Sequence, residues 1–539
     1  MDPLYTSIRY ISTAFAITAL LLIAISILAI AIQVSRISAA PPGIPWVGLN
    51  NKRWFPRLRA TFGEVVASRK PMKEGYEKYA KNNLPFILPA SHWPEIVLPP
   101  SNASWIASQP ENVLSAVTVF NDIMGFEYTA PGPDMAYAHD FAVVQRVLTR
   151  NLLRSLPDVL AEIEVSSSEL LSNVDGEEWK DVRMLDVLGK VSHSAASAMF
   201  VGQPLCRDVD HLKRVRIWVT CFALVSVPYR LLFPKMLQPV FGPLLTVMML
   251  PVKYLAVRPL LPIIGQRLER LRNGRQLEKQ DSGEEGPRDL LQWIVEDAAR
   301  KRNIAQLTPL DLAGKAILVE FLAFLTTSLT ISRVFVDILS CPTASSLLDE
   351  LREEADAVFA RLPSEPTAVR DMLKLDSVIR ESLHQHTMSA HGLQREVVQA
   401  GGITTPDGVY LPQGSHVATF HPDLLDDDVL YDPLRSYKVA MGALNGDGEG
   451  QPRKQKLASD ISGGQSLAFG LGKHACPGRF FAVQNIKLIL GWMVTRYEFL
   501  PLKEEVKMTE VGDAEVPPGK MMVKVRRRQK DMSMVGGEA

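Results

Sequence analysis

The chain has few cysteines, no excess of charge of either sign, and no repeated unit. Its 539 residues include four cysteines, Cys206, Cys221, Cys341 and Cys476, which are far apart and too few to cross-link a chain of this length. This usage indicates a reducing compartment, where at most one or two of the thiols carry chemistry. Lysine plus arginine and aspartate plus glutamate both number 59, so the formal net charge is zero. The composition therefore gives no support for a nucleic-acid-binding protein.

A dinucleotide-binding loop is also missing. No Gly-x-Gly-x-x-Gly opens a strand-to-helix turn, so the sequence gives no sign that the chain itself binds a nicotinamide cofactor. Beyond residue 50 there is neither a second low-complexity linker nor an internal repeat of fixed period. Length alone suggests about three domains, but this continuity favours one large folded unit over residues 51–539.

One long hydrophobic run is present, at the N-terminus. Tyr10 to Ile32 contains 23 residues without a charge, and about 20 helical residues span the hydrocarbon core of a bilayer. A cleaved signal peptide ending at Ser38-Ala-Ala40 is the competing interpretation, but its apolar region should be only about 7–15 residues long. The length therefore predicts a short tail over residues 1–9, followed by a transmembrane anchor over 10–33.

Prolines shape two further segments. Pro41, Pro42 and Pro45 forbid a continued helix, so residues 34–50 are predicted to form a stiff hinge after the anchor. The apolar stretch Trp218–Pro262 contains five prolines between 228 and 251, too many for a regular spanning helix. We expect this stretch either to pack internally or to dip into the bilayer surface and form an entrance for an apolar substrate.

The remaining pattern is mainly that of helices. Apolar residues recur every three or four positions in Phe141–Ile163, Ala313–Leu339 and Asp371–Leu383, which predicts a helix in each. Strand signals are confined to Gln394–Val398 and Val409–Ala418, separated by glycines and a Pro-Asp-Gly turn. The predicted fold class is mainly α with a minor β-sheet region.

Cys476 lies in a glycine-rich stretch, Phe469-Gly-Leu-Gly-Lys-His-Ala-Cys-Pro-Gly478. A thiolate can hold a haem iron and push electron density toward bound dioxygen. Such a sulfur needs backbone amides around it and glycines where a Cβ would collide with the macrocycle. The helix predicted over Arg479–Trp492 adds its positive N-terminal end. A buried structural thiol is the ordinary alternative for a lone cysteine.

Phe469, Gly472, His474, Cys476 and Gly478 together resemble the haem-binding signature of the cytochrome P450 family. The order of the chain is similar too: anchor, proline hinge, long central helix, acidic-basic helix motif, hairpin and cysteine loop. The runs Val201–Asp208 and Leu148–Leu152 resemble fungal secondary-metabolism members, and Cys206 in the first run is expected to be structural. The resemblance implies a cytochrome P450 fold with Cys476 as the axial ligand of a haem b iron, and Phe469, Gly472, His474 and Gly478 as haem-binding residues.

The same resemblance assigns Thr326 and Thr327, in the long central helix, to catalysis. In the family a threonine there hydrogen-bonds the bound oxygen and guides protons to it, and Thr326 takes that place. The preceding position, usually acidic, is Leu325, so proton delivery must differ, and Ala323 is where a small residue lets oxygen fit. The alternative is that the hydroxyl merely bonds back to a carbonyl one helical turn earlier.

Structural support is implied by Glu381, His384 and Arg435. The family has Glu-x-x-Arg on one helical face and a second arginine further along the chain. His384 replaces the first arginine and offers fewer donors and no permanent charge, so this lock should be weaker. The connection before Arg435 also looks short. Arg395 is similar to an arginine that pairs with a haem propionate.

The resemblance implies a monooxygenase that inserts one oxygen atom of O2 into an apolar small molecule. NADPH would supply electrons through cytochrome P450 reductase, with cytochrome b5 as a further candidate partner. The implied location is the endoplasmic reticulum membrane with the catalytic domain in the cytosol, and the implied substrate a terpenoid or polyketide. Two interpretations apply to Lys473, Arg479 and Lys487: a positive surface that attracts an acidic electron donor, or ordinary solvated charges, which are more common. Desaturation, rearrangement or dehydration, and an inactive homologue, are the alternatives.

Overall fold

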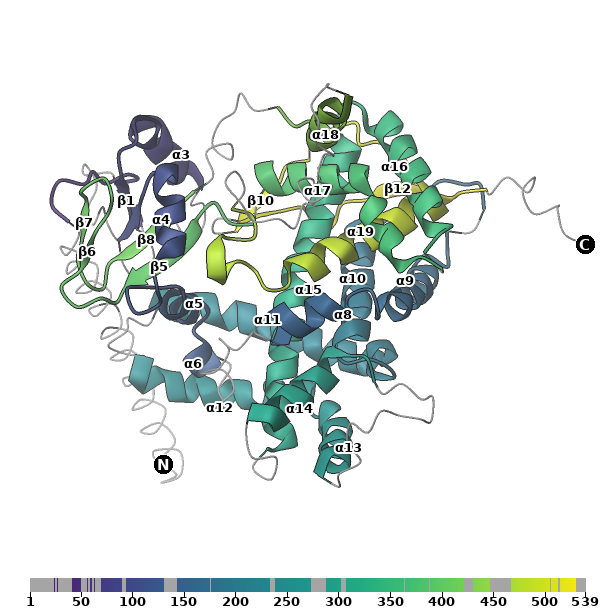
Figure 1. Ribbon diagram of the computed structural model, residues 1–539, viewed down its shortest axis with the longest axis horizontal. Helices are drawn as coiled ribbons and strands as arrows, with labels where there is room; N and C mark the ends of the chain where they lie inside the picture. Colours follow the sequence, from purple (N-terminus) through teal and green to yellow (C-terminus); the bar gives the residue numbers. More distant parts are fainter. Residues whose placement is uncertain are drawn as a thin grey trace, which may run out of the picture. The chain divides into compact units, whose positions relative to one another are not determined.

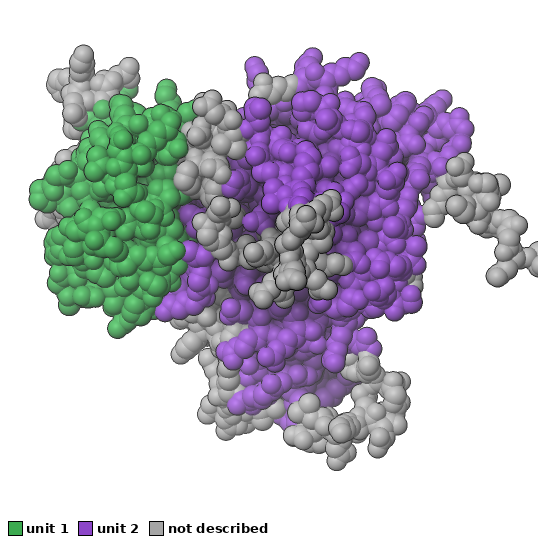
Figure 2. Space-filling view, turned by 45° about the horizontal axis from the view of Figure 1, so that its top comes forward, with its two compact units in different colours: residues 1–131, 220–253, 393–420 green, residues 132–219, 254–392, 421–539 purple. Residues whose placement is uncertain are grey.

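The computed structural model describes residues 24, 27, 41–49, 56, 59–60, 63, 69–89, 94–129, 143–174, 176–232, 238–272, 287–301, 307–362, 364–386, 388–420, 430–445, 467–504, 506–511 and 514–529 (Figure 1). The chain divides into two compact units, coloured separately in Figure 2. Unit 1 comprises residues 1–131, 220–253 and 393–420, and unit 2 comprises 132–219, 254–392 and 421–539. The predicted anchor lies outside the described residues except for Ala24 and Ile27, both of which are helical.

Unit 1 is built on a five-stranded sheet of order β1-β2-β8-β5-β3 and a two-stranded β6-β7 hairpin. Its strands are β1 (Phe86–Leu88), β2 (Glu95–Val97), β3 (Leu114–Ser115), β5 (Gly392–Val397), β6 (Ile403–Thr404), β7 (Tyr410–Leu411) and β8 (His416–Thr419). Its helices are α3 (Arg69–Lys78), η2 (Ala80–Asn82), η3 (Pro100–Asn102), α4 (Ala103–Ser108), α5 (Ala116–Met124) and α6 (Phe126–Thr129). The strand signals at 394–398 and 409–418 are thereby confirmed.

Helix α3 packs closely against this sheet. A Cβ on Gly75 would lie 2.2 Å from the ring of Phe86, so only glycine permits this approach of helix and strand. The Tyr76 and Phe420 rings meet edge to face with centroids 5.7 Å apart. These contacts bury β1 and the end of β8 completely.

Unit 2 is mostly helical. Its helices are η4 (Val143–Leu148), α8 (Thr149–Asn151), α9 (Leu156–Leu170), α10 (Met184–Phe200), η5 (Leu205–Arg207), α13 (Leu260–Arg272), α14 (Leu290–Lys301), α15 (Pro309–Ser340), α16 (Ala344–Phe359), η7 (Pro366–Asp371), α17 (Leu373–Gln385), α18 (Arg435–Asn445), η10 (Gly472–His474) and α19 (Arg479–Arg496). Its strands are β4 (Lys180–Val182), β9 (Tyr497–Phe499), β10 (Thr509–Val511), β11 (Ala514–Val516) and β12 (Val523–Arg527), arranged as a β4-β12-β9 sheet and a β10-β11 hairpin. The predicted fold class, mainly α with small sheets, is confirmed.

Helix α15 is the central element of unit 2 and packs against α10, α13, α14, α16, α17 and α19 (Figure 1). It begins at Pro309, where the missing amide costs nothing, and the Thr308 hydroxyl caps it by accepting from the Asp311 amide at 3.2 Å. The helices predicted over 313–339, 371–383 and 479–492 correspond to α15, α17 and α19.

The single helix predicted over Phe141–Ile163 is wrong. Helical structure ends at Asn151, a turn follows, and α9 starts at Leu156 with Pro157 in its first turn. Proline suits only the first turn of a helix because it lacks an amide hydrogen. Periodicity of apolar residues continued across the break and concealed it.

The prolines of the 218–262 stretch break it less than predicted. Helices α11 (Val209–Leu232) and α12 (Gln238–Val257) fill most of the stretch, and Pro243 and Pro251 lie inside α12. Each proline removes only its own hydrogen bond, which a helix of 20 residues can lose. By length and composition α12 and α15 could each cross a membrane. In the most apolar 18 residues of each helix, 50% of α15 but only 22% of α12 is buried inside the protein.

A buried polar cluster joins α10, α11 and α15. Glu320 lies between His193 and His211, with Nε2 to carboxylate oxygen distances of 3.6 and 3.7 Å and no solvent exposure of any of the three side chains. The Ser197 hydroxyl donates to Glu320 at 2.8 Å. Burial alone raises the pKa of the Glu320 carboxyl, but the two imidazoles outweigh it and hold that pKa below its ordinary value.

Candidate functional site

The Cys476 loop turns twice through glycines before it enters α19. Gly470 and Gly472 both have φ of +69°, a left-handed conformation that glycine adopts without strain. The Cys476 amide then donates to the Phe469 carbonyl at 2.7 Å, and the Ala475 amide donates to the Gly472 carbonyl at 3.1 Å. These bonds fix the cysteine at the end of a closed loop.

Burial and nearby polar groups act in opposite directions on the Cys476 sulfur. The backbone amides of Gly478 and Arg479, at the start of α19, and the Arg479 guanidinium lower the pKa of the thiol. Burial raises the pKa of the Cys476 thiol more than these groups lower it. A positive metal ion bound to the sulfur reverses such a balance, since a coordinating thiol is deprotonated outright.

The loop fits a thiolate-bound haem. Open space adjoins it, because a Cβ on Gly478 would meet nothing within 4 Å. Cys476 is half-buried, whereas Cys206 and Cys341 are fully enclosed. Burial and the nearby Glu162 raise the pKa of Cys206 to about 12, which agrees with the structural role expected for it. Within the described part of the chain, Cys476 is thus the thiol with amide donors and free space together. When bound, haem would supply dioxygen activation.

Arg395 is a buried arginine with an unused donor. It lies on β5 of unit 1 and is 5% exposed, with one Nη atom donating to the Gln394 carbonyl at 2.8 Å. Its other Nη atom is buried without a hydrogen-bond partner among the described residues. Burial lowers the pKa of this guanidinium. A buried cation with an unused donor suits an anionic group such as a haem propionate.

The predicted positive surface around the cysteine loop needs one correction. Lys473 is exposed and Arg479 is half-buried with a hydrogen bond of 2.9 Å to the Cys476 carbonyl, but Lys487 is buried. Its Nζ pairs with Asp376 of α17 at 2.9 Å, and both side chains are 6% exposed. Lys487 therefore ties α19 to α17 and does not reach a protein partner.

Both threonines assigned to catalysis lie in α15. Thr326 is exposed, and its hydroxyl donates to the Leu322 carbonyl at 2.7 Å. This is the bond to a carbonyl one helical turn earlier that a purely structural role predicts. Its two lone pairs remain able to accept hydrogen bonds. Thr327 is 3% exposed and faces the core. The geometry therefore leaves Thr326, and not Thr327, open to a ligand.

The Glu381 carboxylate of α17 accepts hydrogen bonds from several surrounding groups. Its Oε1 accepts from Nε and Nη2 of Arg435 at 3.1 Å, from the Gln385 amide group at 2.9 Å and from the Asp432 backbone amide at 3.1 Å. His384 is half-buried on the same helix. The sequence interpretation missed Gln385. Its side chain donates to Glu381 from the residue next to His384 on the same helix. The connection before Arg435 lies partly outside the described residues.

We expect replacement of Arg435 with lysine to weaken this network. Lysine keeps the charge but cannot donate twice to one carboxylate, so Glu381, 3% exposed, loses part of its compensation. The free energy of unfolding should fall by about 1–2 kcal/mol. Urea denaturation followed by circular dichroism measures the loss, and the haem to protein absorbance ratio measures haem retention.

A companion variant tests the interpretation of position 384. Because Glu381 Oε1 already accepts four hydrogen bonds, His384→Arg should leave the haem content unchanged. A clear rise in haem content with His384→Arg, or an unchanged stability of Arg435→Lys, would contradict this account of the network.

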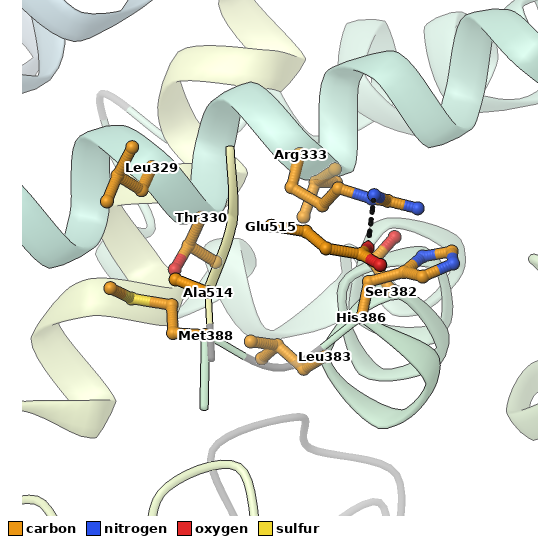
Figure 3. Close-up of a pocket in the computed structure, with 10 residues that line it drawn as sticks. Leu329, Thr330, Arg333, Ser382, Leu383, His386, Met388, Ala514 and Glu515 are labelled. Atoms are coloured by element: carbon orange, nitrogen blue, oxygen red, sulfur yellow. Dashed lines mark hydrogen bonds and ion pairs between the residues drawn. The ribbon is translucent and has the colours of Figure 1, made fainter. Parts of the chain in front are cut away.

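A pocket lies beside α15, between α17 and the β10-β11 hairpin (Figure 3). Its apolar wall is formed by Leu329, Leu383, Met388 and Ala514. The polar wall is internally paired: Arg333 bonds to Glu515 at 3.1 Å and to Asp337 at 2.9 Å, and His386 Nδ1 lies 3.0 Å from Asp337. Pairing of the charges leaves an apolar surface next to the segment that carries Thr326.

Comparison with known proteins identifies the family. The sequence model described as Cytochrome P450 matches residues 135–525. The chain therefore belongs to the cytochrome P450 family and is a haem-containing monooxygenase that receives its electrons from a reductase.

The relatives are fungal proteins. The chain is 29% identical to Cytochrome P450 monooxygenase lnaC of Aspergillus flavus over 477 residues, which are 87% of this chain and 89% of the relative. It is 28% identical to Cytochrome P450 monooxygenase polB of Polytolypa hystricis, covering 91% and 94% of the two chains. It is also 29% identical to Cytochrome P450 monooxygenase nodZ of Hypoxylon pulicicidum, covering 85% and 87%. The family resemblance and the fungal character are confirmed.

Proposed function

We propose that this chain inserts one oxygen atom of O2 into an apolar small molecule of fungal secondary metabolism, with Cys476 as the axial ligand of a haem b iron. The observation that carries the proposal is the Cys476 loop, in which Gly470 and Gly472 have positive φ and the half-buried cysteine lies directly before α19. Phe469, Gly472 and His474 shape the loop around it. Product analysis with purified protein and reductase separates oxygen insertion from desaturation, rearrangement or dehydration.

The chain's own groups have distinct tasks in this proposal. The amides of Gly478 and Arg479 would favour the thiolate form of Cys476 against the effect of burial and so tune the electron density that it donates. Arg395 would neutralise a propionate, and Glu381 with Arg435 would hold α17 and α18 in place. Thr326, the exposed hydroxyl of α15, would turn its hydrogen from the Leu322 carbonyl toward the oxygen side of the haem and guide a proton there by donating a hydrogen bond.

Replacing Thr326 with alanine tests the proton-guiding role. Product formation should fall by about 10²-fold, the lower end of what a positioned proton donor contributes. NADPH consumption should fall less, so the fraction of electrons recovered in product drops. Thr326→Ser keeps the hydroxyl and should restore most of that fraction. Equal electron recovery in Thr326→Ala and the unaltered enzyme would remove Thr326 from the mechanism.

The electron donor of this proposal is NADPH through cytochrome P450 reductase, with cytochrome b5 as a further partner. Exposed Lys473 supports docking of an acidic donor near the cysteine loop. Arg479 lies behind it, half-buried.

We also propose an endoplasmic reticulum location with residues 10–33 as the anchor. Helix α12 supports contact with a bilayer surface, since its side chains include several large exposed apolar groups. These are Val240, Leu244, Val247, Met248, Leu250, Tyr254 and Leu255. Removal of residues 1–40 should move the chain from the membrane pellet to a fraction that alkaline carbonate releases. Full retention in the pellet would argue against the anchor.

The substrate proposed is a terpenoid or polyketide. The similarity to fungal cytochrome P450 monooxygenases supports an apolar small molecule as the substrate. The pocket beside α15 is too small to be the substrate site, since its free volume of about 10 Å³ is that of one water molecule.

A further inference from the structure

Unit 1 contains a cluster of metal-ligand side chains that the oxygenase chemistry does not use. Asp122 of α5, Glu396 of β5 and His416 of β8 each offer one ligand atom, and these atoms all lie within 4.8 Å of one another. His416 Nε2 is 3.6 Å from Glu396 Oε2, and the His416 side chain is 4% exposed. The three residues come from distant parts of the sequence, so the fold alone assembles them.

The backbone explains why they meet. The Val397 amide donates to the Ser415 carbonyl at 2.9 Å, which sets Glu396 beside His416 on neighbouring strands. Ser115 pairs with Glu396 in the β3-β5 ladder, and its hydroxyl caps α5 by accepting from the Thr118 amide at 3.0 Å. Helix α5 therefore starts at the edge of the cluster.

The charge of this face favours a bound cation. Glu95 is opposite His416 in the parallel β2-β8 ladder, so its side chain shares the face, and it is 2% exposed. Gln394 donates to Glu95 at 2.7 Å from two residues before Glu396 on β5. Arg395 lies between them in sequence and thus points to the other face of the sheet. Three carboxylates and one imidazole consequently share this side.

We propose that Asp122, Glu396 and His416 bind a divalent transition-metal ion, zinc in the first place, which ties α5 to the sheet. Ligand atoms around a tetrahedral zinc ion are roughly 3.4 Å apart, given bonds of about 2.0–2.2 Å. The separation of 3.6 Å between His416 and Glu396 matches this spacing. An imidazole nitrogen favours zinc over calcium or magnesium, which prefer oxygen ligands. The three protein ligands leave one position for water.

The test uses the full-length, untagged, haem-loaded protein in detergent, freed of loose metal by dialysis against a chelator. Addition of zinc should load one equivalent more on the unaltered chain than on Asp122→Asn or Glu396→Gln, measured by mass spectrometry of the metal. At about 100 times the dissociation constant, zinc should raise the unfolding temperature by roughly 2–3 °C. Magnesium should have no such effect.

A matched control comes from the same unit. Glu74→Gln removes an exposed carboxylate of α3, which pairs with Lys78 at 2.6 Å, and should keep the full zinc response. Equal zinc content in the unaltered chain and both cluster variants would overturn the proposal. The proposal would also fail if zinc left the unfolding temperature unchanged while Asp122→Asn raised it above that of the unaltered chain. That result would mean that His416 and Glu396 are held together by a shared proton and not by a metal ion. The haem absorbance of each variant confirms that it is folded, and neither readout depends on monooxygenase activity.

Discussion

Replacing Cys476 with serine should abolish the thiolate-type Soret band of the reduced, carbon monoxide-bound protein. A serine hydroxyl is a far weaker acid than a thiol, so it stays protonated and donates little electron density to iron. Loss of groups around a metal ligand commonly costs 10–100-fold in affinity or activity, so loss of the ligand should lower turnover by more than about 100-fold. The difference spectrum of the reduced protein with and without carbon monoxide measures the first effect, and product formation with reductase measures the second.

Cys221→Ser is the matched control for this prediction. Cys221 lies in α11, is half-buried like Cys476, and is not part of the glycine-rich loop. Its replacement should leave the spectrum unchanged. A thiolate-type band that persists in Cys476→Ser, or disappears in Cys221→Ser, would refute Cys476 as the axial ligand.

The cysteine loop could be predicted because its determinants are local. Glycines with positive φ, the cysteine and the start of α19 all lie within about ten consecutive residues. The long helices were predictable for a similar reason, since apolar periodicity within one segment decides them. Local signals failed where the same spacing of apolar residues continued through two helices, which concealed the turn between Asn151 and Leu156.

The contacts between distant segments could not be predicted. Lys487 and Asp376 are 111 residues apart, and both look like ordinary surface charges in the sequence. His193, His211 and Glu320 meet only because α10, α11 and α15 cross. The one available signal was that Glu320 and Lys487 interrupt apolar stretches, which is equally typical of an exposed position.

The buried pair of Lys487 and Asp376 should carry the largest stability effect. Replacing Lys487 with methionine keeps most of its volume but leaves Asp376, 6% exposed, without its cation. Loss of one partner of a buried ion pair costs about 3–5 kcal/mol. A second nearby carboxylate places the expected loss in the upper half of this range. Glu354, whose pKa burial raises, accepts from the backbone amides of Lys374 and Leu375 at 2.6 and 3.0 Å and also senses the Lys487 charge.

Urea denaturation of the haem-loaded protein, followed by circular dichroism, measures this loss. Lys473→Met removes an exposed lysine near the cysteine loop and should change stability by less than about 0.5 kcal/mol. The double variant Lys487→Met with Asp376→Leu should recover much of the stability, because replacement of both charges by apolar groups removes the unpaired carboxylate.

The two lysine variants also distinguish a role in stability from a role in binding the reductase. Lys473→Met should raise the KM for reductase, whereas the folded fraction of Lys487→Met should keep it, because a lysine that is 5% exposed cannot meet an electron donor. A Lys487→Met protein of unaltered stability and weakened reductase binding would reverse this assignment.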